Sequence, residues 1–160
     1  MDISAALAAV ARLRVLVVGD AIIDEYCYVS PLGKSPKETI IVTGHESTES
    51  FHGGAWAAAS HLEDFCGTVH FCVGAKVTVK RRFVEKLRVK KLFEFHFEQE
   101  NVDRLMPGAV LEPSYEDYDV VIITDFGHGF INATRILEIK RRSTFLAVNA
   151  QTNSSNYGYN

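Results

Sequence analysis

The sequence contains little of what marks secreted, membrane or disulfide-stabilised proteins. It has three cysteines in 160 residues, at positions 27, 66 and 72, and no two of them form a C-x-x-C pair. An odd number of cysteines without a secretory signal argues against a disulfide framework and favours a reducing, cytoplasmic compartment. The apolar run at residues 3–10 is short and has no basic segment before it, so it predicts a helix. No run approaches the roughly 18 apolar residues that a membrane span requires.

Several catalytic and ligand-binding signatures are also missing. The six histidines stand at no recognised metal-ligand spacing, so we expect no metal site, and no nucleophile-elbow motif supports a hydrolase. Gly33-Lys34-Ser35 resembles the end of a P-loop, but Tyr28 occupies the first glycine position and Pro36 follows the serine, which excludes that motif. The triplet at residues 125–127 (Asp-Phe-Gly) occurs without the other motifs of protein kinases.

The charge of the chain gives no general reason to expect nucleic acid as a partner. Seventeen Lys and Arg residues face twenty Asp and Glu residues, for a formal net charge of -3. One basic stretch, residues 76–91, leaves a nucleic-acid surface open as an alternative. We favour a solvated or partner-facing strand pair there, because only Phe83 and Phe93 could stack on bases.

Four continuous apolar runs, rich in β-branched residues, predict buried strands at residues 14–20, 69–73, 118–125 and 144–149. Predicted helices at 2–11, 54–65 and 132–142 lie between or before them, with Asn132 as a possible cap. Strands that alternate with helices predict a single α/β domain with a mostly parallel sheet.

Other segments do not fit that alternation. Two short strands are predicted at 25–29 and 39–43, around a Pro- and Gly-containing loop at 31–36, and two longer ones at 76–84 and 88–97. Residues 99–117 are mixed, with a helix broken at Pro107-Gly108. The extra strands predict a small β-layer that projects from the sheet.

Candidate binding residues follow the ends of predicted strands. Asp24 closes the pattern Gly19-Asp20-x-x-x-Asp24, and Asp125 ends a later strand. Ligands of open α/β sheets bind outside the carboxyl ends of the strands, where an acid can accept hydrogen bonds from sugar hydroxyls. Gly53-Gly54 opens a helix, where glycines allow close approach of a ligand to the backbone. Each feature alone also fits a structural role, as a loop cap or a tight turn.

Together these pieces resemble the PfkB/ribokinase family of carbohydrate kinases, in its N-terminal half. The similarity is greatest to the branch that contains the ADP-heptose pathway kinase domain and related sugar kinase/nucleotidyltransferase proteins. The matching segments follow one another in the family's order: VLVVGDAIIDEY (15–26), PLGKSPKE (31–38), FHGGAWAAASHL (51–62), TVKRRFVE (78–85), YDVVIITDFGHG (118–129) and FLAVNAQTNSSNYGYN (145–160).

The resemblance implies a partial ribokinase-like three-layer α/β sandwich, with a β-lid whose strands lie within residues 25–51 and 76–97. It implies that Asp24 binds sugar hydroxyls, that Gly53 and Gly54 line the sugar site, and that Lys34 lies in a loop that could meet the phosphate of a phosphosugar. The parent activity is phosphorylation of a sugar or phosphosugar hydroxyl by ATP with Mg²⁺.

The chain departs from the family pattern at three places. Ala57 stands where many members carry a sugar-contacting asparagine, and Gly74-Ala75 leads almost directly into the second strand pair. The family's Gly-Ala-Gly-Asp motif, which carries the catalytic base, is absent from these 160 residues. We therefore expect the chain to hold only the sugar-binding side, with no catalytic residue, no assured cofactor and no measurable ATP-dependent kinase activity.

The alternative is a non-catalytic sugar- or nucleotide-binding module, or an oligomerising module. The resemblance favours a homo-oligomer formed through lid strands. The strand predicted at 144–149 would lie at an exposed sheet edge, which also favours association.

Overall fold

The apolar run that begins at Val15 forms the centre of a parallel sheet. The computed structural model describes residues 2–152, and within them strand β1 (Arg14–Gly19) lies between β4 (Thr68–Cys72) and β7 (Val120–Asp125). Strand β8 (Leu146–Ala150) pairs with β7, and all three pairings are parallel, in the order β4-β1-β7-β8. The α/β class and the parallel sheet predicted from the sequence are confirmed, and β8 lies at an edge of this sheet.

Helices cover both faces of the parallel sheet because alternate strand residues point to opposite sides. Leu16 and Val18 pack in one cluster with Ile139 of α4 (Ala133–Arg142), whereas Val17 packs in another with Ala55 and Ala59 of α2 (Gly54–Glu63). The side chain of Asn132 accepts a hydrogen bond from the Arg135 N–H, which confirms the predicted cap of α4. Helix α1 (Ile3–Val10) precedes β1 and buries none of its residues.

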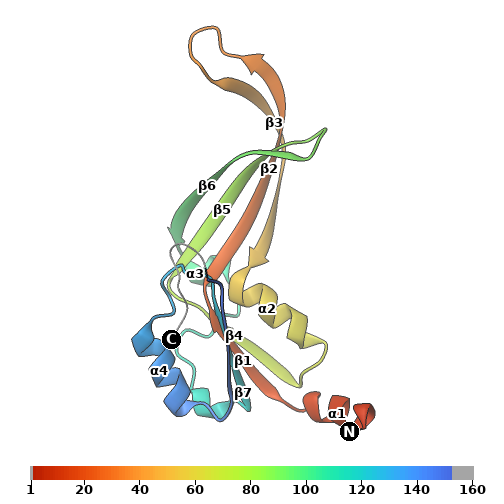
Figure 1. Cartoon of the computed structure of the whole chain (residues 1–160), viewed down its shortest axis with the longest axis vertical. Helices are drawn as coiled ribbons and strands as arrows, with labels where there is room; N and C mark the ends of the chain where they lie inside the picture. The colour runs from red at the N-terminus through yellow and green to blue at the C-terminus, as the bar shows by residue number, and fades with distance from the viewer. Residues whose placement is uncertain (1, 153–160) are drawn as a thin grey trace.

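A second sheet projects from one end of the parallel sheet (Figure 1). It contains β2 (Ala21–Lys34), β3 (Ile41–Gly53), β5 (Lys76–Glu85) and β6 (Lys90–Glu100), in the order β3-β2-β5-β6. Strands β2 and β5 are parallel, and the other two pairings are antiparallel. We call it the projecting sheet.

Several predicted bounds were too narrow. Strand β2 begins one residue after Asp20 and runs through most of the loop predicted at 31–36, while β3 continues to Gly53. The helix predicted within 99–117 is instead shorter than expected. It consists of α3 (Val102–Leu105) and a 3₁₀ turn (Tyr115–Asp117), and Pro107-Gly108 lies between these two elements. Residues 153–160, part of the last matching segment, lie outside the described residues.

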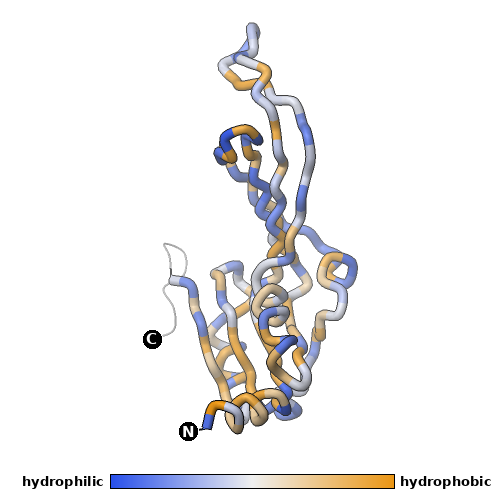
Figure 2. The backbone as a smooth tube through the Cα atoms, turned by 90° about the vertical axis from the view of Figure 1, so that its right-hand side faces the viewer, coloured by the Kyte–Doolittle hydropathy of each residue, from blue (hydrophilic) through white to orange (hydrophobic). Residues whose placement is uncertain are grey.

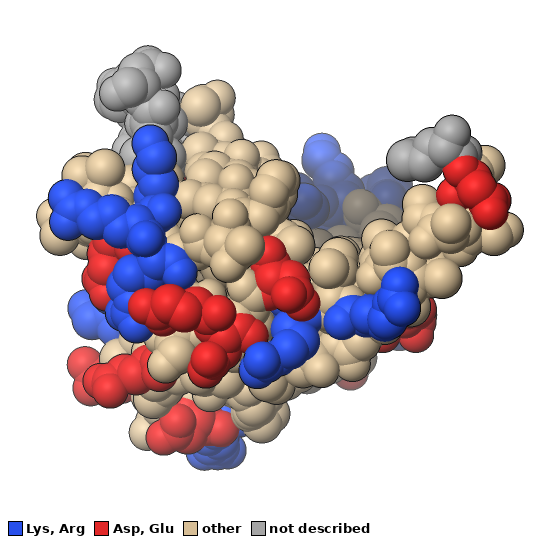
Figure 3. Space-filling model, turned by 90° about the horizontal axis from the view of Figure 1, so that it is seen from below, with Lys and Arg blue, Asp and Glu red and all other residues tan. Residues whose placement is uncertain are grey.

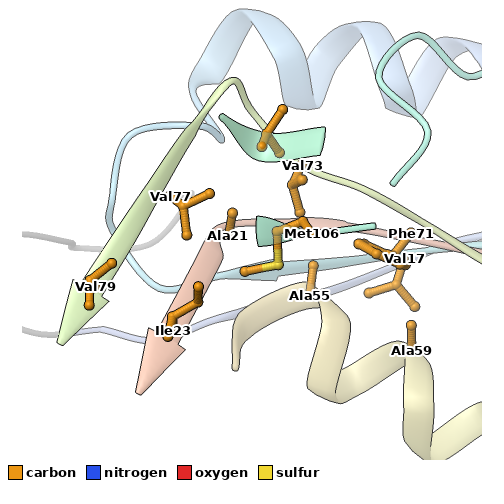
Figure 4. Close-up of a cluster of buried hydrophobic side chains, with 11 residues drawn as sticks. Val17, Ala21, Ile23, Ala55, Ala59, Phe71, Val73, Val77, Val79 and Met106 are labelled. Carbon is orange, nitrogen blue, oxygen red and sulfur yellow. The ribbon is translucent and has the colours of Figure 1, made fainter. Parts of the chain in front are cut away.

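A shared core fixes the base of the projecting sheet. Ile23, Val77 and Val79 of that sheet pack in one buried cluster with Ala55 of α2 and with Met106 (Figure 4). Apolar residues concentrate along the parallel strands, while the projecting part is more mixed in hydropathy (Figure 2). The base is therefore anchored by apolar burial, and the outer part projects away from the core. Within residues 2–152, every helix is too short or too polar to cross a membrane.

Candidate functional site

A cavity of about 320 Å³ lies where the two sheets meet. Its walls include Asp20 between β1 and β2, Lys76 and Thr78 of β5, Glu98 of β6 and His128 in the loop after β7. The carboxyl ends of β1, β4 and β7 all lead to this place, as expected for a ligand site in an open α/β sheet. The cavity is lined by charged and polar groups as well as apolar ones.

Asp20 organises the loop at the floor of the cavity. Its side chain is only 1% exposed, and its carboxylate accepts hydrogen bonds from the backbone N–H groups of Phe126 (2.8 Å), His128 (3.4 Å) and Phe130 (3.4 Å). A buried carboxylate requires such donors to offset its desolvation. Asp20 therefore ties the end of β1 to the loop that carries His128.

One face of the projecting sheet continues from the cavity. Thr78 and Glu98 line the cavity. Every second residue of β5 and β6, counted from these two, points to the same face of the sheet. Cross-strand register places Asp24 of β2 opposite Lys80 of β5, which is opposite His96 of β6. We call this the inner face; it comprises Ile22, Asp24, Tyr26, Thr78, Lys80, Arg82, Glu94, His96 and Glu98.

Charged groups form a network along the inner face. Arg82 donates a hydrogen bond to Asp24 and forms an ion pair with Glu94, and Glu94 also contacts His96. The Arg82 guanidinium lies 5.3 Å from the centre of the Tyr26 ring. Partial burial alone would raise the pKa of Glu94, but the hydrogen bond with His96 and the charge of Arg82 lower it. The carboxylate predicted to bind sugar is thus held by an arginine of the neighbouring strand.

The predicted glycine pair lies beside Asp24. Gly53 ends β3, and a Cβ added to it would lie 2.8 Å from Oδ2 of Asp24. Gly54 opens α2 at a φ of 59°, and a Cβ there would lie 2.1 Å from the carbonyl oxygen of Asp20. Asp24, Gly53 and Gly54 are therefore neighbours in the structure, close to the point where β2 leaves the parallel sheet.

The other two predicted residues lie elsewhere. Lys34 is exposed at the far end of β2, ten residues beyond Asp24, or roughly 30 Å along the strand. Asp125 is buried at the end of β7, where its carboxylate accepts a hydrogen bond from the Gly127 N–H at 2.9 Å. Lys34 is not brought to the cavity, whereas Asp125 shapes the loop beside it.

His128 and Lys80 were not among the residues predicted for the site. Burial, and secondarily the charge of Lys80, lower the pKa of His128, while Asp20 acts in the opposite direction. The buried Nε2 atom of His128 has no hydrogen-bond partner within residues 2–152. The sequence signal for His128 was its position between two glycines, just after the end of a strand. The alternation of side chains along residues 78–82 could have placed Thr78, Lys80 and Arg82 on one face of a strand.

Four of the eight basic residues in the stretch at 76–91 form ion pairs with acids of the projecting sheet. Lys76 pairs with Glu98 at 2.7 Å, Arg81 with Glu25 at 2.6 Å and Lys86 with Glu46 at 3.0 Å. Elsewhere, seen from below, basic and acidic side chains are intermixed (Figure 3). Pairing with acids of the same sheet accounts for these charges.

The described part of the chain offers no group of three His, Cys, Asp or Glu side chains placed to hold a metal ion.

Comparison with known proteins returns solved structures only. No family model and no curated protein matches the chain. A ribokinase from Thermotoga maritima matches with 13% identity over 85% of this chain and 52% of that one, at a TM-score of 0.46. A Methanocaldococcus jannaschii nucleoside kinase, an archaeal member of the ribokinase family, matches with 12% identity over 86% of this chain and 61% of that one, at a TM-score of 0.40.

A ribokinase from Cryptococcus neoformans in complex with ADP matches with 14% identity over 86% of this chain and 49% of that one, at a TM-score of 0.40. The chain thus spans about half the length of the solved ribokinases that it matches. Two of these solved structures are ribokinases, and the third is described as an archaeal member of the ribokinase family.

Proposed function

We propose that this chain provides the sugar-binding side of a ribokinase-type carbohydrate kinase. The parent reaction is attack of a sugar or phosphosugar hydroxyl on the γ-phosphate of ATP. The main support for the proposal is that Asp24 lies beside Gly53 and Gly54. These residues are located where the inner face adjoins the carboxyl ends of the parallel strands. The protein would act in the cytoplasm, in keeping with its three free thiols.

Each group has a defined role in holding an acceptor sugar. The Asp24 carboxylate accepts hydrogen bonds from sugar hydroxyls, and Arg82 orients that carboxylate. Gly53 has no side chain, so a sugar ring can approach the backbone next to Asp24. Fixing a hydroxyl in this way supplies the positioning on which phosphoryl transfer depends.

The donor side of the reaction is not assigned to these residues. ATP and Mg²⁺ belong to the parent activity, and the Gly-Ala-Gly-Asp motif is absent from the 160 residues. Asp24 is therefore proposed as a binding residue and not as the catalytic base.

Replacing Asp24 by asparagine tests the proposal. Binding of a panel of sugars and sugar phosphates is measured by isothermal titration calorimetry on the wild-type chain, on Asp24→Asn and on Asp64→Asn, an exposed control. We expect at least one sugar to bind the wild type and the control equally, and Asp24→Asn to bind it about tenfold or more weakly, because a charged hydrogen bond is lost. Equal binding by Asp24→Asn would contradict the proposal.

A specific observation also favours an oligomerising module. Phe93 and Phe95 of β6 are 58% and 54% exposed on the face opposite the inner face, and Phe93 stacks on Phe83 with ring centres 4.4 Å apart. Exposed aromatic groups of this kind mark association surfaces. A homo-oligomer formed through the projecting sheet is compatible with the kinase proposal.

A further inference from the structure

Two side chains near the cavity, Lys80 and His128, have polar groups that are not paired within the described residues. Around the cavity and the inner face, Lys76 pairs with Glu98, and Arg82 with Asp24 and Glu94. The carboxylate of Asp20 is occupied by three backbone N–H groups. Within residues 2–152, Lys80 forms no ion pair, and Nε2 of His128 has no hydrogen-bond partner.

Lys80 lies on the inner face that continues from the cavity, and His128 lines the cavity. The charge of Lys80 lowers the pKa of His128, although Lys80 is on β5 and His128 is in the loop after β7. Lys80 is partly buried and forms no ion pair, so a ligand anion would offset part of the cost of burying its ammonium group. Thr78, on the same side of β5 as Lys80, lines the cavity together with His128.

We propose that Lys80 and His128 bind the phosphate group of the acceptor, so that the acceptor is a sugar phosphate. This inference rests on the proposed function, because it places the phosphate beside the Asp24 site. Lys80 is the register partner of Asp24, and paired residues of adjacent strands lie about 5 Å apart. A monosaccharide phosphate can therefore place hydroxyls at Asp24 and its phosphate at Lys80.

The neighbouring cations are less suited to this role. Lys76 is exposed and already paired with Glu98, and Arg82 is committed to two carboxylates. Lys34, which the sequence resemblance suggested for a phosphate, lies at the far end of β2. Lys80 replaces Lys34 as the phosphate contact.

Inorganic phosphate and a matched pair of ligands, ribose and ribose 5-phosphate, provide the test. Binding is measured by calorimetry at constant ionic strength on the wild type, Lys80→Met, His128→Gln and the control Lys90→Met, which removes an exposed lysine of β6. We expect the wild type and the control to bind phosphate, and the two site variants to bind it about tenfold or more weakly. Circular dichroism establishes that each variant is folded.

The outcomes separate this inference from the proposed function. Phosphate binding that Lys80→Met leaves unchanged, or no phosphate binding by the folded wild type, overturns the inference. Sugar binding that depends on Asp24 and is indifferent to phosphorylation also overturns it, while the proposed function stands. Phosphate binding that depends on Lys80 and His128, without binding of any sugar, supports the anion site and contradicts the proposed function.

Titration of His128 provides an independent readout. Burial, Lys80 and His96 lower its pKa, and Asp20 and Asp125 raise it. A bound anion adds a negative charge nearby, so the His128 pKa followed by NMR should rise when sulfate, whose charge is constant over this range, is added. The rise should be smaller in Lys80→Met; an unchanged pKa in the wild type would contradict direct contact of His128 with the anion.

Discussion

Asp20 is the residue on which the geometry of the cavity most depends. Its buried carboxylate holds three backbone N–H groups of the loop at 126–130. We expect Asp20→Asn to lower the free energy of unfolding by about 2–4 kcal/mol, because an amide cannot accept from all three donors and turns donors of its own toward them. Urea unfolding measures the loss. Asp64→Asn, at an exposed position, should change stability by less than about 0.5 kcal/mol, and an equally small effect of Asp20→Asn would contradict this role.

The two glycines should respond differently to substitution by alanine. Gly54 has a left-handed φ and lies against the Asp20 carbonyl, so Gly54→Ala should cost about 2–4 kcal/mol of stability. At Gly53 the closest atom to an added Cβ is a carboxylate oxygen of Asp24, which can rotate away. Gly53→Ala should therefore change stability by less than about 1.5 kcal/mol but weaken acceptor binding. Thermal unfolding and calorimetry on both variants test this, and equal losses of stability would show the assignment to be wrong.

Residue patterns predicted part of the candidate site. Asp24 and the glycine pair were named from strand-end and helix-start patterns and from the family resemblance, and the structure places them together. Lys34 could not be excluded from sequence, because its distance from Asp24 depends on whether residues 31–36 form a loop or continue a strand. Lys80 and Arg82 could not be singled out within the basic stretch. Whether each of them is paired or available to a ligand depends on which acids lie opposite on the neighbouring strands.

At the scale of elements, the exposed phenylalanines of β6 predict self-association. Replacing Phe93 and Phe95 by serine removes two large exposed rings from the face opposite the site, so we expect an oligomer of the wild type to dissociate at least tenfold more readily. Sedimentation velocity measures the change, and Leu137→Ser, at an exposed position of α4, is the control. A wild type that stays monomeric at micromolar concentration would contradict this expectation.

Strand type was easier to predict than strand length. Strands β1 and β7 are continuous apolar runs because most of their residues are buried, and that pattern was visible in the sequence. The prediction that residues 144–149 are a buried strand was wrong about burial, because β8 lies at the sheet edge and leaves Val148 and Asn149 exposed. Pro31 and Gly33 predicted a loop, but β2 and β3 remain paired there through a register shift between these two residues. An irregular pairing tolerates the missing N–H of proline, so a local signal for a turn was overridden by the partner strand.

At the scale of the whole molecule, the two sheets share one of the two buried clusters, and a cavity lies where they meet. The cluster around Ile23, Val77 and Met106 fixes the base of the projecting sheet above the carboxyl ends of the parallel strands. The lengths of β2 and β3 carry the rest of the sheet away from that base (Figure 1). This arrangement brings side chains more than a hundred positions apart, such as Asp20 and His128, into one site.

Mapping backbone amide shifts of the ¹⁵N-labelled chain during titration with a sugar phosphate tests the acceptor-site account most directly. The account predicts one saturable set of changes, confined to residues around Asp24, Gly53-Gly54, Thr78, Lys80 and the loop that carries His128. Asp24→Asn should require about tenfold or more ligand to produce the same changes. Changes centred on Lys34 and the outer end of the projecting sheet, or no saturable changes with any sugar or sugar phosphate, would contradict it.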